Sequence, residues 1–193
     1  ATGITPDFIV VDGAEGGTGA GPLEFEDHVG TPLTEGLVFV HNALVGCGLR
    51  DRIKVGCSGK VATGFTIVSR LAQGADFTYS ARAMMFALGC IQAMRCHNNT
   101  CPVGVATQDP ARTRALVVVD KADRVAEFHA NTVASALSLL AAMGLEGTDR
   151  LGPHLLRRRV SPETTKTYDD LYHYLEPEQL LSLPPDAWAP ASE

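Results

Sequence analysis

Short β-branched runs, each followed by a small-residue turn and a longer amphipathic stretch, fill the first two-thirds of the chain. Such an alternation is typical of βα units, in which a parallel sheet lies between helices. The runs are Asp7–Val11, Arg52–Cys57 and Asp76–Ser80, and the stretches are Leu33–Gly48, Gly64–Gly74 and Ala83–Arg95. We therefore expect an α/β fold with a parallel sheet.

The apolar pattern within these segments predicts how they pack. The runs Asp7–Val11 and Arg52–Cys57 lack strict polar alternation, so we expect these strands to be buried on both faces. The stretch Ala83–Arg95 is apolar nearly all round, which predicts a deeply packed helix. Farther along, Asp120–Met143 has the clearest helical period; its first residue can cap the start, and a glycine follows its end.

Three βα units do not close a barrel, because a (β/α)8 barrel has eight strands and about 250 residues. We expect residues 1–150 to form the C-terminal part of such a barrel, its last three βα units, with the first strand at an open edge. Residues 151–193 are expected to form a C-terminal extension with short helices, one of them over Tyr168–Leu175. An open doubly wound sheet is the alternative, although three strands make a poor one. The missing initiator methionine and the early first strand favour a fragment.

The charge balance narrows the class of partner. The chain has 16 Lys and Arg against 22 Asp and Glu, a net charge of −6 and a pI near 5.5. This composition argues against a nucleic-acid binder, which needs a basic face, and we interpret the run Arg157–Arg159 as a solvated surface strip. No stretch has the roughly eighteen apolar residues of a membrane span. The first residues lack the basic leader and apolar region of a signal peptide, so we expect a cytoplasmic protein.

A glycine-rich loop follows the first predicted strand and contains Gly13, Gly16, Gly17 and Gly19. Glycine permits positive φ and a close approach of the backbone, which a bound ring system or phosphate requires. Ligands of parallel α/β folds bind at this end of the strands. The loop matches neither the Rossmann nor the P-loop phosphate fingerprint, so a ligand-free turn is the competing interpretation.

Small-residue turns with one cation each follow the second and third predicted strands. The first turn contains Ser58, Gly59 and Lys60, and the second contains Ser80, Ala81 and Arg82. Exposed backbone N–H groups and the N-termini of the following helices favour an anion at such turns. Because the loops after the last two strands of a barrel often form its phosphate site, the two turns predict a cup for one phosphate. The alternative is that both cations point to solvent or pair with nearby carboxylates.

Three cysteines lie close together in the sequence, at Cys90, Cys96 and Cys101, and Pro102 follows the last of them. Clustered thiols in a chain without an export signal favour metal or redox chemistry over disulfides. Three thiolates suit an iron–sulfur cluster with three irons and four sulfides, since the common clusters need four cysteines. Zinc with His97 as a fourth ligand and three unliganded thiols are the alternatives.

Four strings of the sequence carry a resemblance to a known family: VDGAEGGTGAGPLEFEDHVG, CSGKVATGF, SARAMMFALGC and CIQAMRCHNNTCPVGVATQDP. The chain resembles the FMN-binding domain of glutamate synthase, and it is most similar to the stand-alone FMN-binding glutamate synthase-like proteins. The resemblance covers residues 3–175, and the cysteine string is its most specific part. It implies a (β/α)8 barrel to which this chain contributes the last three strands.

The resemblance also implies cofactors and a reaction. FMN would lie with its phosphate on the turns at Ser58, Gly59, Lys60, Ser80, Ala81 and Arg82, with Glu15, Gly16 and Gly17 lining the mouth near the flavin. A 3Fe–4S cluster would lie on Cys90, Cys96 and Cys101 and relay electrons to the flavin from an electron-donor protein or subunit. The implied reaction converts 2-oxoglutarate and ammonia into L-glutamate by hydride transfer from reduced FMN. One continuous helix from Arg82 to Cys90 would place the two cofactors in the same region.

Several departures from the family limit what the resemblance implies. Ala14 stands where the large glutamate synthases have a histidine, and no N-terminal nucleophilic cysteine is present, so glutamine hydrolysis is not expected here. The part of the barrel that would supply the catalytic residues and much of the 2-oxoglutarate site lies outside this sequence, so we expect the isolated chain to be inactive. One alternative is a zinc-stabilised, non-catalytic half-barrel or binding module. Another is a different FMN barrel, such as an isomerase or 2-hydroxy-acid oxidase, although such an enzyme has no use for clustered cysteines.

Overall fold

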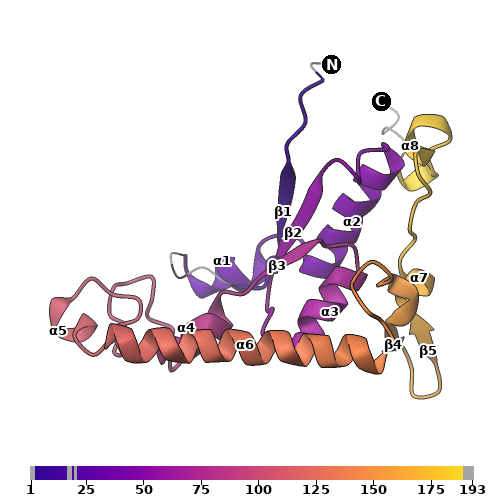
Figure 1. The fold of residues 1–193 in the computed structure, drawn as a ribbon. Helices are drawn as coiled ribbons and strands as arrows, with labels where there is room; N and C mark the ends of the chain where they lie inside the picture. The colour runs from indigo at the N-terminus through magenta and orange to yellow at the C-terminus, as the bar shows by residue number, and fades with distance from the viewer. Residues whose placement is uncertain (1–2, 17–18, 20, 189–193) are drawn as a thin grey trace.

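The structure is a computed structural model that describes residues 3–16, 19 and 21–188. A three-stranded parallel sheet, of order β1-β2-β3, is formed by β1 (Phe8–Asp12), β2 (Lys54–Ser58) and β3 (Phe77–Tyr79). Each strand lies within the segment predicted for it or is shifted by one or two residues, so the predicted α/β fold with a parallel sheet is confirmed. The strands and the helices that follow them are shown in Figure 1.

The helices follow the chain order expected for βα units. In the first part of the chain they are α1 (Leu23–His28), α2 (Leu33–Gly46), α3 (Gly64–Ala72) and α4 (Arg82–Leu88). Then come α5 (Pro110–Thr113), α6 (Val118–Ala142), α7 (Tyr168–Leu171), α8 (Gln179–Ser182), and the 3-10 turns η1 (Pro153–Leu155) and η2 (Asp186–Trp188). A helix long and apolar enough to cross a membrane is not found among the residues that the structure describes.

The main core lies between the sheet and α2. Its buried members are Leu33, Leu37, Leu44, Ile53, Val55, Cys57 and Ala75. Ile9 and Val11 of β1 pack against this cluster, whereas Phe8 and Val10 point to the opposite face and are 53% and 40% exposed. The prediction that β1 is buried on both faces is therefore wrong, because the described elements cover only its α2 side.

Aromatic side chains line the open face of the sheet. The Phe77 ring lies edge-on to Phe8, with ring centroids 6.1 Å apart, and to Tyr79, at 5.6 Å. Gly56 of β2 pairs with Phe77 in the register, and a Cβ at this glycine would lie 2.4 Å from the Phe77 ring. Only glycine leaves room there, so the sequence positions this aromatic ring on the sheet.

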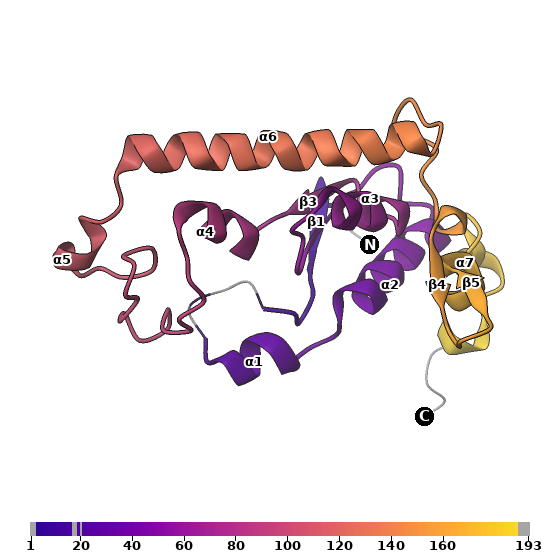
Figure 2. The same ribbon diagram turned by 90° about the horizontal axis from the view of Figure 1, so that it is seen from below.

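The long helix α6 runs beside α3 and α4, as both views show (Figures 1 and 2). Val68 of α3 packs with Ala136 and Leu140 of α6 in a second buried cluster. The two helices approach closely at Gly64, where a Cβ would lie 2.4 Å from the Ala136 backbone nitrogen. The predicted helix over Asp120–Met143 is confirmed, but Asp120 lies in its first turn rather than at its N-cap.

Helix α4 is shorter and more exposed than predicted. It ends at Leu88 because Gly89 adopts a left-handed φ of 107°, and the N–H groups of Gly89 and Cys90 bond back to the carbonyls of Phe86 and Met85. The prediction of a deeply packed helix over Ala83–Arg95 is therefore wrong. The segment that carries the cysteines begins as a loop.

The C-terminal segment packs on the outer side of α2. The buried Asn42 side chain donates to the His173 carbonyl (2.7 Å) and accepts from the Leu175 N–H (3.1 Å), and the Trp188 ring stacks on Phe39. This segment also contains an antiparallel hairpin, β4 (Arg157–Arg159) with β5 (Thr165–Thr167), which the sequence did not predict. The three arginines are exposed, as expected for a solvated strip.

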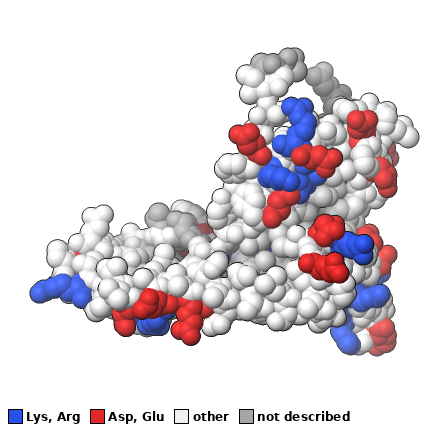
Figure 3. Space-filling model, in the orientation of Figure 1, with Lys and Arg blue, Asp and Glu red and all other residues white. Residues whose placement is uncertain are grey.

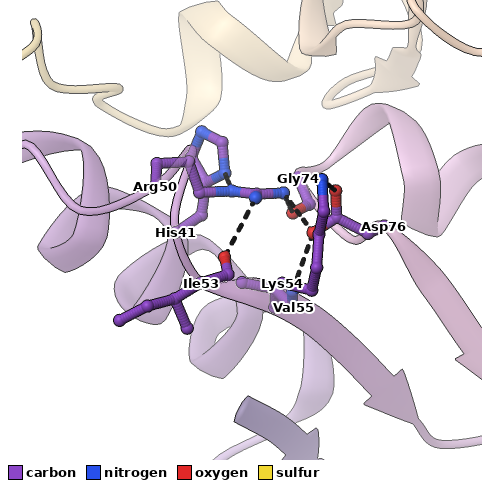
Figure 4. A network of polar contacts seen from close by, with 7 residues as sticks. All are labelled: His41, Arg50, Ile53, Lys54, Val55, Gly74 and Asp76. Atoms are coloured by element: carbon purple, nitrogen blue, oxygen red, sulfur yellow. Dashed lines mark hydrogen bonds and ion pairs between the residues drawn. The ribbon is translucent and has the colours of Figure 1, made fainter. Parts of the chain in front are cut away.

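A network of polar contacts fixes the amino ends of β2 and β3 (Figure 4). The Arg50 guanidinium lies 2.8 Å from the Asp76 carboxylate and donates to the Gly74 carbonyl (2.9 Å) and the His41 Nδ1 (3.3 Å). Asp76 also accepts from the Val55 N–H (2.7 Å). Two loops and α2 are thereby joined by one guanidinium.

The pKa values in this network agree with its contacts. Burial lowers the pKa of His41, and the neighbouring Arg50 lowers it further, so the imidazole stays neutral and can accept from the guanidinium. Burial alone would raise the pKa of Asp76, but the Val55 N–H and Arg50 hold it below its usual value. The network lies at the end of the strands opposite to the loops described next.

Candidate functional site

The loops after the three parallel strands meet at one edge of the sheet, because the carboxyl ends of parallel strands lie together. The Gly13 N–H donates to the Ser58 carbonyl (3.0 Å), which joins the glycine-rich loop to the turn after β2. The Ser80 Oγ donates to the Val61 carbonyl (2.7 Å), which joins that turn to the one after β3. The three loops that the sequence singled out are therefore neighbours.

A cavity of about 220 Å³ lies between these loops. Its lining includes most of the predicted cofactor residues: Glu15, Gly16, Ser58, Gly59, Lys60, Ala81 and Arg82. Ser80 does not line it, and its hydroxyl donates in the contact between the two turns. Gly17 lies outside the described residues. Tyr79 and Phe86 also line the cavity and were not predicted, and the same is true of Val61, Ala62, Ala83 and Gln92. Tyr79 ends β3 on the same face as Phe77, so strand alternation was the signal for it.

Two of the lining residues hold the loop in place. The Glu15 carboxylate accepts from the Leu33 N–H (3.1 Å) and so binds the first turn of α2. Gly16 has a φ of 79°, and its N–H donates to the Glu26 carbonyl (2.8 Å). The glycine-rich loop is thus fixed to both α2 and α1.

The two predicted cations differ in their surroundings. Lys60 is exposed, has a left-handed φ of 48° in its turn, and forms no ion pair with any residue in the described ranges. The Arg82 guanidinium lies 3.0 Å from the Glu26 carboxylate and 3.9 Å from that of Asp27. Arg82 thus pairs with carboxylates of α1, whereas Lys60 does not.

A second cavity, of about 180 Å³, is lined by Cys90, Cys96, Cys101 and His97. The three predicted ligand cysteines thus face one space. Within the part of the chain that the structure describes, however, no group of three His, Cys, Asp or Glu side chains is close enough to hold a metal ion. The glycine-rich loop touches this segment, since a Cβ at Gly19 would lie 2.9 Å from the Cys96 Cβ.

Cys101 is the buried member of the trio. Burial alone would raise the pKa of its thiol, but the backbone N–H groups of Ala106, Val103, Val105 and Gly104 point to the sulfur and hold the pKa below its ordinary value. The loop after Cys101 therefore surrounds this sulfur with hydrogen-bond donors.

The two cavities are adjacent. Arg82, Phe86 and Gln92 line both of them. The helix predicted between Arg82 and Cys90 ends before Cys90, yet the cysteines still lie at the same end of the strands as the turn after β3.

Charged side chains of both signs are interspersed on the face drawn in Figure 3.

Comparisons with known proteins place these loops in a family context. Residues 1–146 match the family described as a conserved region in glutamate synthase. The glutamate synthase large subunit-like protein YerD of Bacillus subtilis (strain 168) is 41% identical over 172 residues, which are 89% of this chain and 33% of that protein. The archaeal glutamate synthase (NADPH) of Methanocaldococcus jannaschii is 37% identical over 145 residues, 75% of this chain and 28% of that protein.

Among solved structures, a mutant flavocytochrome b2 with pyruvate bound is similar with a TM-score of 0.42 and 16% identity, over 66% of this chain and 26% of that one. We base no argument on a likeness at this level. The chain spans a third or less of the two relatives described above.

Proposed function

Because the chain belongs to the glutamate synthase family, we propose that it is part of a cytoplasmic oxidoreductase that makes L-glutamate from 2-oxoglutarate and ammonia. In this enzyme the chain would supply the three cysteines and the binding site for the cofactor phosphate. The observation that carries this proposal is the pair of adjacent cavities at the carboxyl ends of the strands. One has small-residue turns and a lysine that forms no ion pair within the described part of the chain, and the other has three thiols. When bound, FMN supplies hydride chemistry, and an iron–sulfur cluster supplies one-electron chemistry. The electron donor is proposed to be a separate protein or subunit.

The first cavity fits a phosphate group in size and charge. A Cβ at Gly59, where φ is 149°, would lie 3.0 Å from Leu33 Cδ2, so the turn stays narrow and its backbone accessible. Lys60 supplies a cation at the cavity rim, and Phe86 and Val61 form apolar parts of the wall beside it. These residues would bind and orient FMN through its phosphate.

The second cavity fits an iron–sulfur cluster in donor chemistry. Thiolates are the ligands that such clusters use, and Cys90, Cys96 and Cys101 all face this space. Two residues of the intervening loop, Gln92 and Met94, have positive φ values of 55° and 53°. We propose that this loop draws Cys90 and Cys96 toward Cys101 when the cluster binds.

The open face of the sheet indicates that other strands complete the site. Phe8, Val10 and Tyr79 expose 53%, 40% and 47% of their surfaces on or beside this face, and the relatives are about three times as long as the matched part. We propose that further strands of a (β/α)8 barrel cover these side chains and supply the contacts to 2-oxoglutarate. The chain by itself would then be inactive.

A zinc-stabilised, non-catalytic module is the second candidate. His97 lines the same cavity as the three cysteines, which is the ligand set of a Cys₃His site. Metal analysis and the visible spectrum separate the two candidates, because a zinc protein is colourless and an iron–sulfur protein is brown.

Lys60→Ala in the full-length protein is expected to weaken FMN binding about tenfold, because it removes the charge that faces the phosphate. The affinity for riboflavin, which lacks the phosphate, should change little. Fluorescence quenching of each flavin by the apoprotein measures both affinities.

The matched control is Lys166→Ala, which removes an exposed lysine from β5, away from the cavity. Its FMN affinity should equal that of the wild-type protein. An equal loss of FMN and riboflavin affinity in Lys60→Ala would remove Lys60 from the phosphate site.

A further inference from the structure

The Arg82 guanidinium is held by a buried carboxylate from a distant part of the chain. Its Nη2 lies 3.0 Å from Glu26 Oε2, and the Glu26 side chain is only 5% exposed, whereas that of Arg82 is 42% exposed. Nη1 lies 3.9 Å from Asp27 Oδ1, an atom that is buried and has no hydrogen-bond partner among the described residues. Helix α1 therefore supplies the fixed partner, and α4 supplies the exposed one.

The glycine-rich loop is shaped to let this contact form. A Cβ at Gly16 would lie 2.6 Å from Arg82 Nη2 and 2.7 Å from Asp27 Oδ1, so a larger residue would push the guanidinium away from α1. The Gly16 N–H also donates to the Glu26 carbonyl, which fixes the backbone that carries the carboxylate. The guanidinium thus lies against both the loop and α1.

Pairing with Glu26 leaves Arg82 able to bind a second anion. A guanidinium has five N–H donors in a planar fork, and Glu26 accepts from Nη2. Arg82 also lines both cavities, so its remaining donors are beside the space that we assign to the phosphate. Without a buried partner, a long exposed side chain of this kind extends into solvent.

We propose that Glu26 is a positioning residue, which acts through Arg82 by holding the guanidinium in the wall between the two cavities so that its free donors face the FMN phosphate. This inference rests on the proposed function, since it requires FMN in the first cavity. It assigns a role to a residue of α1 that none of the three loop motifs contains.

Glu26→Gln in the full-length protein tests the proposal, with FMN and riboflavin as the two probes. The FMN affinity is expected to fall about tenfold and the riboflavin affinity to change less than about twofold, because only FMN carries the phosphate. Glu24→Gln, on the exposed side of the same helix, is the matched control and should retain both affinities. Glu26→Asp, which keeps the charge with a shorter reach, should restore part of the FMN affinity.

A double-mutant comparison tests whether Glu26 acts through Arg82. Glu26→Gln should cause no further loss of FMN affinity in an Arg82→Ala background. Equal losses of FMN and riboflavin affinity, additive losses in the double mutant, or tighter FMN binding in Glu26→Gln would each overturn the proposal while leaving the proposed function intact. A wild-type protein that binds neither flavin would overturn the proposed function, and this inference with it.

Discussion

Cys101→Ser in the full-length protein is expected to remove nearly all of the iron that the proposed iron–sulfur cluster would contribute. Cys101 is the buried cysteine of the trio, and its sulfur is surrounded by backbone N–H groups of the following loop. Its replacement would leave the proposed cluster with two of its three thiolates. A serine hydroxyl is a poor ligand for iron, and binding of the proposed cluster would contribute to the folding free energy, so the variant should also unfold at a lower temperature. Iron and acid-labile sulfide assays on the purified protein measure the first effect, and thermal unfolding measures the second.

Cys47→Ser is the matched control, because Cys47 is half-buried at the end of α2 and lies outside the cysteine cavity. This variant should retain iron at the wild-type level. Full iron content in Cys101→Ser would contradict the assignment of this cavity to a cluster. Replacement of the iron by zinc in the wild-type protein would favour the non-catalytic module.

Arg50→Ala is expected to lower the free energy of unfolding by about 2–3 kcal/mol. The change leaves the Asp76 carboxylate without its guanidinium and removes the donor to the Gly74 carbonyl and to His41 Nδ1. The cost is below that of a fully buried pair because the side chains of Arg50 and Asp76 are 18% and 24% exposed. Urea unfolding followed by circular dichroism gives the free energy.

Arg52→Ala provides the comparison for Arg50→Ala. Arg52 is exposed, and among the described residues its side chain makes one long hydrogen bond, 3.4 Å to Thr5 Oγ1, so its truncation should change stability by less than about 0.5 kcal/mol. Equal stability changes in the two variants would show that the network at the amino ends of β2 and β3 does not hold the fold together.

The strands and their loops could be predicted because they depend on local sequence patterns. The β-branched runs ending near Asp12, Ser58 and Tyr79 are short and bounded by turns, and parallel pairing then brings the following loops to one edge. The lining of the first cavity follows from that topology. The same topology explains why a sequence pattern can predict that the glycine-rich loop and the turn containing Lys60 are neighbours.

Features that depend on distant contacts or on backbone conformation could not be predicted in the same way. The apolar pattern continues through Cys90, so it does not indicate where α4 ends. The helix ends because Gly89 adopts a left-handed conformation. The pairing of Arg82 with Glu26 joins residues 56 positions apart, and no local pattern reports it. The short hairpin with Arg157–Arg159 has charged residues in place of an apolar alternation.

The exposure of β1 illustrates a further limit. The apolar residues of β1 predict a strand, and the structure confirms it. Burial, however, depends on which elements cover each face, and the described elements cover only the side of Ile9 and Val11. Phe8 and Val10 therefore remain exposed in spite of their hydrophobicity. We attribute their apolar character to further strands of the proposed barrel.

The FMN and iron content of the full-length protein, purified without added cofactors, tests the central claim most directly. We expect a coloured protein that releases FMN on denaturation and contains iron with acid-labile sulfide. A well-folded full-length protein that is colourless and holds neither flavin nor iron would contradict the claim that these two adjoining cavities bind redox cofactors.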